Sequence, residues 1–170
     1  MAQERAFNKE PCGLNAIVAS ALDIAASNLS EQTSIHTEYD EMLSPIAGDA
    51  DQLIQVIYNI IVNAHQAMHP CDRKPMIRLK TFENKAAQTA VVEVSDSGPG
   101  IPEALQERVF EPLISTKEVG EGTGMGLALS HRIVTGHKGS ITIGQSDLGG
   151  ALFEIHLPLA PRASDANTPC

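Results

Sequence analysis

The 170-residue chain is 42% hydrophobic and 19% charged, with 4% aromatic residues and no tryptophan, which predicts one soluble domain with an aliphatic core. Its net charge of -9 excludes a general nucleic-acid or anionic-membrane surface, because such surfaces cluster Lys and Arg. Without a long apolar run or a basic-then-apolar leader, we expect a cytoplasmic chain with no direct membrane contact. Three scattered cysteines favour reduced thiols over disulfides or a zinc site.

The first part of the chain predicts a helix and a strand behind an approach segment. Residues 1–13 are polar and contain proline and glycine, so we expect them to lie outside the core. Apolar residues from 14 to 29, including Ile24, recur with helical spacing and predict an amphipathic helix. Alternation over residues 34–40 predicts a half-buried strand with His36 exposed.

Two asparagines lie on the next helix, which a broad apolar face predicts over residues 52–68, after a cap at Asp49 or Asp51. Asn59 and Asn63 are four residues apart and therefore project from one side. Asparagine is a poor helix former, so the presence of two asparagines in an otherwise apolar helix needs an explanation. The pair is either a polar edge in contact with solvent or a source of amide oxygen for a hard cation such as Mg²⁺.

A carboxylate follows a predicted hairpin of strands 76–82 and 90–95. The segment Asp96-Ser97-Gly98-Pro99-Gly100-Ile101-Pro102 places this carboxylate in a tight turn at the end of the second strand. Asp96 either bonds its own backbone or accepts a hydrogen bond from the exocyclic amine of adenine, with small neighbours that leave room for the ring. We take Asp96 as the best single candidate for nucleotide specificity.

Four glycines alternate in Gly120-Glu121-Gly122-Thr123-Gly124-Met125-Gly126-Leu127, just before a helix predicted over residues 127–134. Glycine allows close backbone approach to a ligand, and a helix start offers N–H groups to an anion. The loop is therefore either a phosphate-binding candidate or a flexible surface connection. It lacks the spacing of a P-loop or dinucleotide fingerprint. We expect the connection before it, with a short helix over 103–110, to be mobile.

The end of the chain predicts a second hairpin and a tail. The helix after the glycine loop should stop near Gly136 or Gly139. Residues 140–144 and 151–157 alternate around a turn over 146–150, with His156 at an exposed position. Residues 161–170 are mostly small and polar, so we expect a disordered tail.

Four blocks now stand in one order: Asn59-x3-Asn63, Asp96-x-Gly98-x-Gly100, Phe110-Glu111-Pro112 and Gly122 to Leu127. They resemble the N, G1, F and G2 boxes of the ATP-binding domain of sensor histidine kinases, in the clan shared with gyrase and heat-shock chaperone ATPases. Four ordered boxes arise by chance far less often than one. The resemblance implies an α/β two-layer sandwich, with a mixed, about five-stranded sheet under three helices and a mobile ATP lid.

The resemblance also implies a division of the chain into three parts. Residues 1–13 would be a linker from a dimerisation and acceptor region that is not in this chain. Residues 14–160 would be the ATP-binding catalytic domain, and residues 161–170 the disordered tail.

ATP and Mg²⁺ are the ligands that the resemblance implies. Asn63 would bind Mg²⁺ and Asp96 would read the adenine amine. The other implied nucleotide contacts are Asn59, Gln66, Gly98, Gly100, Ile101, Thr116, Lys117, Gly122, Thr123, Gly124, Met125, Gly126 and Leu127. Gln66 stands where many family members carry Lys or Arg. Because its amide is neutral, Lys117 would have to neutralise more of the phosphate charge. The chain also departs from the family at Leu113-Ile114, where aromatics are common, and at Lys138, where a second glycine often follows the histidine.

Asn59 favours one reaction within the clan. The clan's ATPases place Glu there as a general base on water, and an asparagine amide cannot do that. Transfer of the γ-phosphoryl group to a histidine on a partner helix is the better interpretation, with Asn59 and Lys117 as its catalytic residues. A clan ATPase and an anti-sigma-like serine kinase or binding module remain the alternatives. A pseudokinase is disfavoured because every expected nucleotide contact is present.

The acceptor histidine itself is missing from the chain. None of its six histidines has the His-Glu-x4-Pro context of the family's acceptor helix. We therefore expect a catalytic fragment of a longer kinase, or a kinase that acts in trans. Its partners would be the dimerisation and histidine-phosphotransfer region of the same parent kinase and a downstream response regulator, and no nucleic acid. The fragment would be monomeric and the parent, which could be membrane-anchored, a homodimer.

Overall fold

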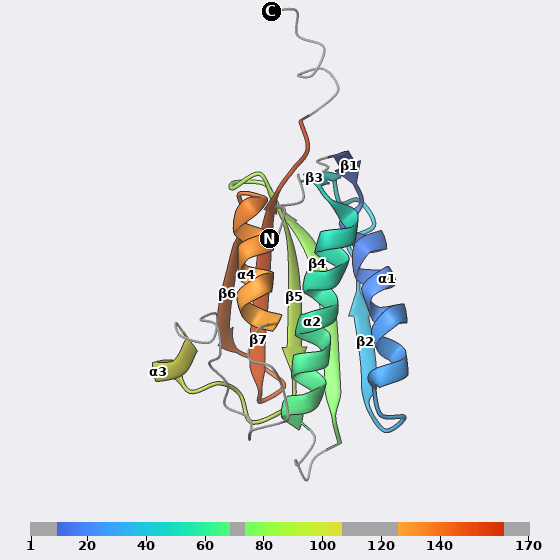
Figure 1. Cartoon of the computed structure of the whole chain (residues 1–170), viewed down its shortest axis with the longest axis vertical. Helices are drawn as coiled ribbons and strands as arrows, with labels where there is room; N and C mark the ends of the chain where they lie inside the picture. Colours follow the sequence, from blue (N-terminus) through green and yellow to red (C-terminus); the bar gives the residue numbers. More distant parts are fainter. Residues whose placement is uncertain (1–9, 69–73, 107–125, 162–170) are drawn as a thin grey trace, which may run out of the picture.

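The computed structural model describes residues 10–68, 74–106 and 126–161 (Figure 1). Three helices and five long strands make up most of the described fold. In chain order the elements are β1 Glu10–Cys12, α1 Leu14–Ala25, a 3-10 turn Ala26–Asn28, β2 Ser34–Glu38, β3 Ile46–Gly48, α2 Ala50–Met68, β4 Met76–Asn84, β5 Thr89–Asp96, α3 Glu103–Gln106, α4 Gly126–Gly136, β6 Ser140–Gln145 and β7 Ala151–Pro158.

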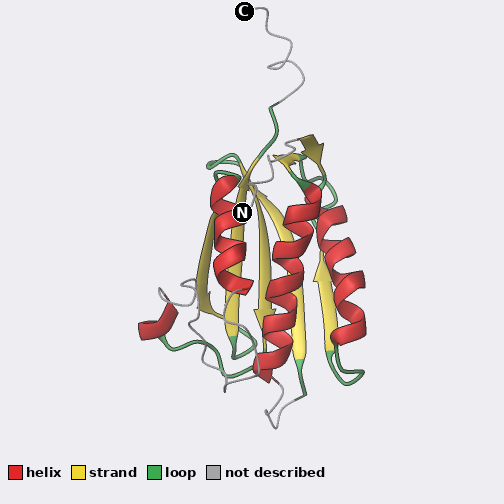
Figure 2. Ribbon diagram, viewed as in Figure 1, coloured by secondary structure: helices red, strands yellow, loops and turns green. Residues whose placement is uncertain are grey.

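The main sheet is mixed and has the strand order β2-β4-β5-β7-β6. β2 runs parallel to β4, and each of the other neighbouring pairs is antiparallel. Helices α1, α2 and α4 lie side by side over one face of this sheet (Figure 2). The predicted two-layer α/β architecture and both predicted hairpins, β4–β5 and β6–β7, are confirmed.

A second, two-stranded sheet was not predicted. β1 pairs with β3 in antiparallel register, with Glu10 opposite Gly48, and Ile46 of β3 forms an isolated bridge with Leu159. Both strands are three residues long, too short for the alternation by which a strand is recognised in sequence. Residues 10–12 are therefore an edge strand, in which Glu10 and Pro11 are exposed and Cys12 packs against the core.

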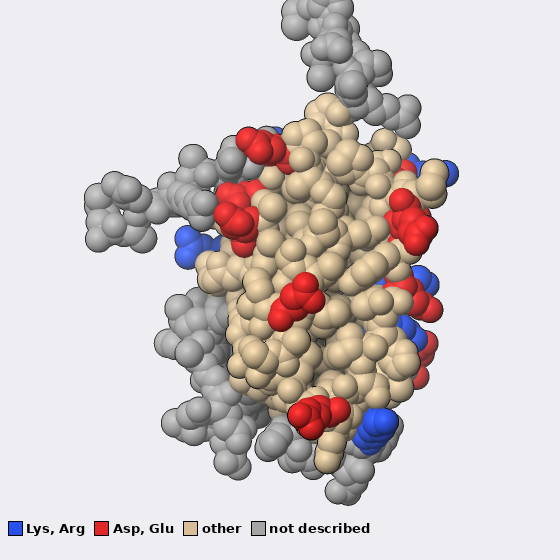
Figure 3. Space-filling model, turned by 90° about the vertical axis from the view of Figure 1, so that its right-hand side faces the viewer, with Lys and Arg blue, Asp and Glu red and all other residues tan. Residues whose placement is uncertain are grey.

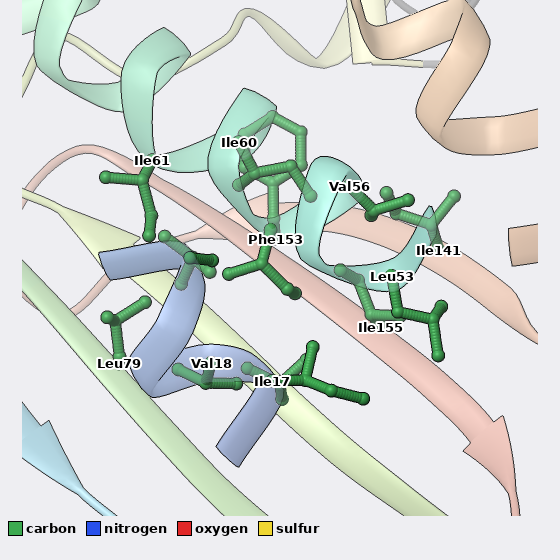
Figure 4. Packing of buried hydrophobic residues seen from close by; sticks show 14 of the residues in the cluster. Ile17, Val18, Leu53, Val56, Ile60, Ile61, Leu79, Ile141, Phe153 and Ile155 are labelled. Carbon is green, nitrogen blue, oxygen red and sulfur yellow. The ribbon is translucent and has the colours of Figure 1, made fainter. Parts of the chain in front are cut away.

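The core between helices and sheet is aliphatic, as the composition predicts. The side chains that α2 and α1 direct at the sheet meet those of β4, β6 and β7 (Figure 4); the labelled members are Ile17, Val18, Leu53, Val56, Ile60, Ile61, Leu79, Ile141, Phe153 and Ile155. Each such side chain stabilises the fold by about 1.5–3 kcal/mol. The assignment of Ile24 to the apolar face of the first helix was wrong, because its side chain is 56% exposed.

The opposite face of the sheet carries charges of both signs. Glu93 on β5 stands opposite Lys80 on one side and Glu154 on the other. Burial and the neighbouring Glu154 raise the pKa of Glu93 above its ordinary value. On the face drawn in Figure 3, basic side chains do not gather into a patch, and acidic and basic groups meet along one edge.

His137 joins the end of α4 to the start of α2. Its ring is 2% exposed, and its Nε2 accepts the Asp49 backbone N–H at 2.9 Å. Its Nδ1 lies 2.8 Å from the Ile133 carbonyl oxygen, so the two contacts together select the tautomer with its proton on Nδ1. Asp49 is also the predicted cap of α2, because its Oδ1 accepts the Gln52 N–H at 3.3 Å.

Lys138 takes the left-handed position that ends α4. Its φ is +61°, and its N–H donates to Thr135 O while the Gly139 N–H donates to Val134 O, both at 2.9 Å. This is the hydrogen-bond pattern of a Schellman cap, in which the residue with left-handed conformation is usually glycine. The departure from the family at Lys138 therefore falls at a position where a side chain is strained.

Replacing Lys138 with Gly is expected to stabilise the fold by about 0.5–1 kcal/mol. A left-handed lysine costs more than the extra chain entropy that a glycine loses on folding. Urea unfolding of the wild type and of Lys138→Gly measures the difference. Lys85→Gly, at an exposed turn position without positive φ, is the matched control and should be neutral or destabilising. Equal effects of the two substitutions would contradict the strain argument.

Candidate functional site

The described segments of the predicted site converge on one end of the molecule, the lower end in Figure 1. There α2 and β5 end, α4 begins, and the turn between β6 and β7 passes by. These segments are far apart in sequence, and the sheet order brings them together because β5 and β7 are antiparallel neighbours. The end of the fold that carries β1 and β3 lies opposite.

Asp96 is the buried carboxylate at this end. It is the last residue of β5 and is 2% exposed. Its Oδ1 accepts the backbone N–H of Gly98 at 2.9 Å and that of Ala151 at 3.1 Å. Neither of these two bonds uses Oδ2, so Oδ1 alone anchors the turn.

The pKa of Asp96 is raised above its ordinary value of 3.8. Burial causes the rise, and the N–H groups of Gly98 and Ala151 oppose it only in part. Of the two alternatives from the sequence, the structure shows the first: Oδ1 bonds the backbone of its own turn at Gly98. The contact with the adenine amine stays a prediction. A buried carboxylate with a perturbed pKa is a marker of a functional site.

The turn after Asp96 is fastened to β4 and to the end of α2. Ser97 exchanges hydrogen bonds with Met76, receiving its N–H on Oγ at 2.9 Å and donating its own N–H to the Met76 carbonyl at 3.1 Å. A Cβ at Gly98 would lie 2.9 Å from Met68 Cγ and 3.2 Å from Asp96 Oδ1. Gly98 is therefore required by close packing beneath the carboxylate.

Gly100 has φ +78°, the left-handed conformation that favours glycine. Ile101 next to it is half-buried against the core, and its carbonyl accepts the Gln106 side-chain amide at 3.0 Å. The two glycines of this turn thus have separate roles: Gly98 provides space and Gly100 provides backbone conformation.

Of the two asparagines of α2, Asn59 lies at the middle of the helix and Asn63 in the half that approaches this end. Asn59 and Asn63 are both half-buried, while Gln66 in the last turn is exposed. His65 is half-buried beside Thr33, with 3.4 Å between its Nδ1 and the threonine Oγ1. Among the residues that the structure describes, no three His, Cys, Asp or Glu side chains gather to hold a metal ion.

Part of the predicted site lies outside the described residues. The residues concerned are the Phe110-Glu111-Pro112 block and the predicted lid residues Thr116, Lys117 and Gly122 to Met125. Gly126 and Leu127 are described: they begin α4, and Leu127 is half-buried against the core. The start of α4 therefore stands at the same end of the fold as Asp96.

Sequence reasoning missed Gly150 and Ala151. The Gly150 N–H donates to the Asp96 carbonyl at 3.0 Å, and the next N–H along the chain, that of Ala151, reaches the Asp96 side chain. The pair Gly149-Gly150 was interpreted only as turn residues of the second hairpin. Its signal was present, since two adjacent glycines exceed what that turn needs.

No helix within the described ranges combines the length and apolar character that a bilayer crossing requires. This finding concerns residues 10–68, 74–106 and 126–161 only.

Comparison with known proteins places this fold in one class, that of nucleotide-binding ATPase-type domains. Residues 48–161 match the family described as "Histidine kinase-, DNA gyrase B-, and HSP90-like ATPase". The chain belongs to this family. Its relatives there are sensor kinases, so the chain carries the catalytic ATP-binding domain of a sensor histidine kinase.

Two curated relatives illustrate the relationship. The sensory histidine kinase/phosphatase NtrB of Rhodobacter capsulatus is 37% identical over 164 residues, which cover 90% of this chain and 44% of that protein. The signal transduction histidine-protein kinase AtoS of Escherichia coli is 36% identical over 152 residues, 89% of this chain and 24% of that protein. The chain thus spans less than half the length of either relative.

Solved structures show the same fold. The catalytic domain of the histidine kinase ThkA superposes with a TM-score of 0.78 at 25% identity, covering 89% of this chain and 96% of that one. Full-length ShkA in complex with AMPPNP superposes with a TM-score of 0.79 at 22% identity, covering 95% of this chain and 33% of that one. The expected two-layer architecture with a five-stranded mixed sheet is therefore confirmed.

Proposed function

We propose that this domain binds Mg²⁺-ATP and transfers the γ-phosphoryl group to a histidine on a dimerisation helix outside the chain. One observation carries the proposal: the buried Asp96 carboxylate is held by two backbone N–H groups on one oxygen only. Such a group can accept a hydrogen bond from the adenine amine through Oδ2, beside a turn that Gly98 keeps small. Family membership supports ATP as the nucleotide.

The residues of α2 and the glycine loop take the phosphate end of the ligand in this proposal. A hard cation prefers oxygen ligands, and the amide of Asn63 offers one from the half of α2 near Asp96. Water and phosphate oxygens would supply the other ligands. A bound Mg²⁺ would neutralise charge that develops on the phosphates. Thr116, Lys117 and residues 122–127 remain proposed phosphate contacts, with Gln66 at the rim.

The transfer itself breaks the bond between the γ-phosphorus and the bridging oxygen and forms a bond from phosphorus to an imidazole nitrogen. ADP leaves, and the proton on the other ring nitrogen, which becomes more acidic once phosphorus is bound, passes to solvent. Asn59 can position these groups but cannot act as a base on water, which favours transfer over hydrolysis. The proposed partners are therefore the phosphotransfer region of the parent kinase and a response regulator, in the cytoplasm.

The test is radiolabelled ATP transfer by this chain alone and after addition of the dimerisation and acceptor-histidine segment of the parent gene. We expect label on the added segment only, in acid-labile and base-stable form. Free phosphate released by the chain alone, at a rate that the segment does not change, would instead favour a clan ATPase. Label on a serine of an added protein, independent of the segment, would favour the anti-sigma-like alternative.

Replacing Asn63 with Ala is expected to weaken binding of Mg²⁺-ATP about 10-fold and binding of ATP in EDTA much less. The reason is the loss of one oxygen ligand to the cation, which matters only while the cation is present. Fluorescence titration with a labelled nucleotide, in Mg²⁺ and in EDTA, measures both affinities. Gln55→Ala, at an exposed position on the same helix and outside the proposed site, is the control. Equal losses in the two buffers would contradict metal ligation by Asn63.

A further inference from the structure

The turn between β6 and β7 lies directly against the turn that presents Asp96. Two consecutive residues at the junction of this β6–β7 turn with β7 bond the aspartate. The Gly150 N–H donates to the Asp96 carbonyl, and the Ala151 N–H donates to Asp96 Oδ1. Both the backbone and the side chain of Asp96 are thus fixed from outside its own loop. This contact is distinct from the bond that Asp96 makes to Gly98 within its own turn.

Gly150 leaves no room for a side chain at this contact. A Cβ built there would overlap Asp96 Oδ1 and would lie 2.6 Å from both the Asp96 carbonyl oxygen and the Gly98 nitrogen. Its neighbour Gly149 has φ +106°, so that glycine is explained by conformation, whereas Gly150 is not among the described residues with positive φ. Space beside the carboxylate is therefore the reason for glycine at position 150.

The β6–β7 turn is itself held in place on the sheet. The Ser146 N–H donates to the Gly150 carbonyl at 2.7 Å, and the Ser146 hydroxyl accepts the Leu148 N–H at 2.9 Å. Asp147 forms an ion pair with Arg78 of β4 at 2.6 Å, although Asp147 is largely exposed. The turn is a fixed support for Asp96 rather than a loose connection.

We propose that Gly150 is a positioning residue that sets the adenine preference of the pocket. By allowing the Gly150 and Ala151 N–H groups to approach Asp96, it directs Oδ1 to the backbone and leaves Oδ2 for the exocyclic amine of the base. A side chain at position 150 would turn or displace the carboxylate while the phosphate contacts on α2 and α4 stay in place. This inference rests on the proposed role of Asp96 in binding adenine.

The test compares ATP with inosine triphosphate, which carries a carbonyl oxygen where adenine has its amine. We expect the wild type to prefer ATP about 10-fold or more, since the contact involves a charged acceptor. In Gly150→Ala the ratio of the two affinities should fall to about 1, with the affinity for inosine triphosphate nearly unchanged. Gly144→Ala is the matched control, because a Cβ there meets no atom within 4 Å in the same hairpin; its ratio should equal that of the wild type.

Asp147→Asn provides a second variant that loosens the turn without adding an atom to it. Here we expect a smaller fall in the ratio, with circular dichroism like that of the wild type. This variant decides the question if Gly150→Ala does not fold: a ratio equal to that of the wild type would then overturn the proposal.

Three outcomes separate this inference from the proposed function. A folded Gly150→Ala that keeps the wild-type ratio, while Asp96→Asn loses it, overturns the role of Gly150 alone. Parallel losses for ATP and inosine triphosphate in Gly150→Ala indicate general distortion and also overturn it. A wild type that binds the two nucleotides equally overturns the adenine role of Asp96, and the inference with it.

Discussion

Asp96→Asn is expected to lower the affinity for ATP about 100-fold without unfolding the domain. Its amide oxygen can still accept the N–H groups of Gly98 and Ala151, so the turn keeps its anchors. The amide nitrogen then replaces Oδ2 and presents a donor to the donor amine of adenine. Loss of a charge-assisted hydrogen bond, with two donors left facing each other, is worth about 3 kcal/mol. Isothermal titration calorimetry measures the affinity.

Stability should not fall with affinity in this variant. Because burial raises the folded pKa of Asp96 above 3.8, the folded state favours the protonated form. The stability that this preference contributes is present below the unfolded pKa and is lost as pH rises through the folded pKa. At pH 7 a neutral asparagine is therefore tolerated, and urea unfolding should show no loss.

The same shift predicts how ATP binding depends on pH. Oδ1 already accepts two N–H groups, so a proton added to Asp96 falls on Oδ2 and turns it into a donor. Affinity for ATP should therefore decline as pH falls through the raised pKa, and Asp96→Asn should lack this step. Asp23→Asn, on the exposed side of α1, removes the same charge and serves as control. Unchanged affinity in Asp96→Asn would contradict the adenine assignment.

His137→Phe is expected to destabilise the fold by about 2–3 kcal/mol. Phenylalanine keeps the shape of the ring but leaves the buried Asp49 N–H without its acceptor, at the point where α2 begins. Loss of the ring contact costs less at the Ile133 carbonyl, because this oxygen also accepts the His137 backbone N–H at 3.1 Å. Urea denaturation and a fall in Tm of several degrees should report the change.

His36→Phe is the matched control for that substitution. His36 is an exposed residue of β2, as predicted, and aromatic residues suit strands, so this variant should be near neutral. If His137→Phe were as stable as His36→Phe, the bond between α4 and α2 would contribute nothing. Nucleotide affinity of the folded variant should change little, because His137 follows the end of α4 and bonds the start of α2, whereas Asp96 lies at the end of the fold where α2 ends and α4 begins.

Long periodic segments were predictable because their signal is repeated within the segment. The apolar face of α2 recurs over five turns, β4 alternates over its first six residues, and β5 is a mostly buried run rich in valine. The ends of all three were predicted to within about two residues. For Asp96, the Gly-Pro turn indicated one contact that the structure shows, the bond from the Gly98 N–H to the carboxylate. Its role toward a nucleotide stays a prediction.

Contacts made across the sheet could not be predicted in this way. Gly150 lies 54 positions after Asp96, and only the pairing of β5 with β7 makes them neighbours. β1 and β3 likewise exist because they pair with each other, not because either three-residue segment favours a strand. His156, predicted to be exposed, is half-buried because β6 and β5 flank it on both sides.

The small sheet of β1 and β3 gives the two ends of the described fold a shared attachment. β3 pairs with Glu10–Cys12 on one side and bridges Leu159 on the other, and the Ala160 N–H donates to the Pro45 carbonyl at 2.8 Å. A pulling force applied between residues 10 and 161 would load these few bonds before the five-stranded sheet. The β1–β3 sheet and its bonds to Leu159 and Ala160 would break first and release the ends of the chain. The turn that carries Asp96, at the opposite end, would keep its shape until the strands of the larger sheet separated.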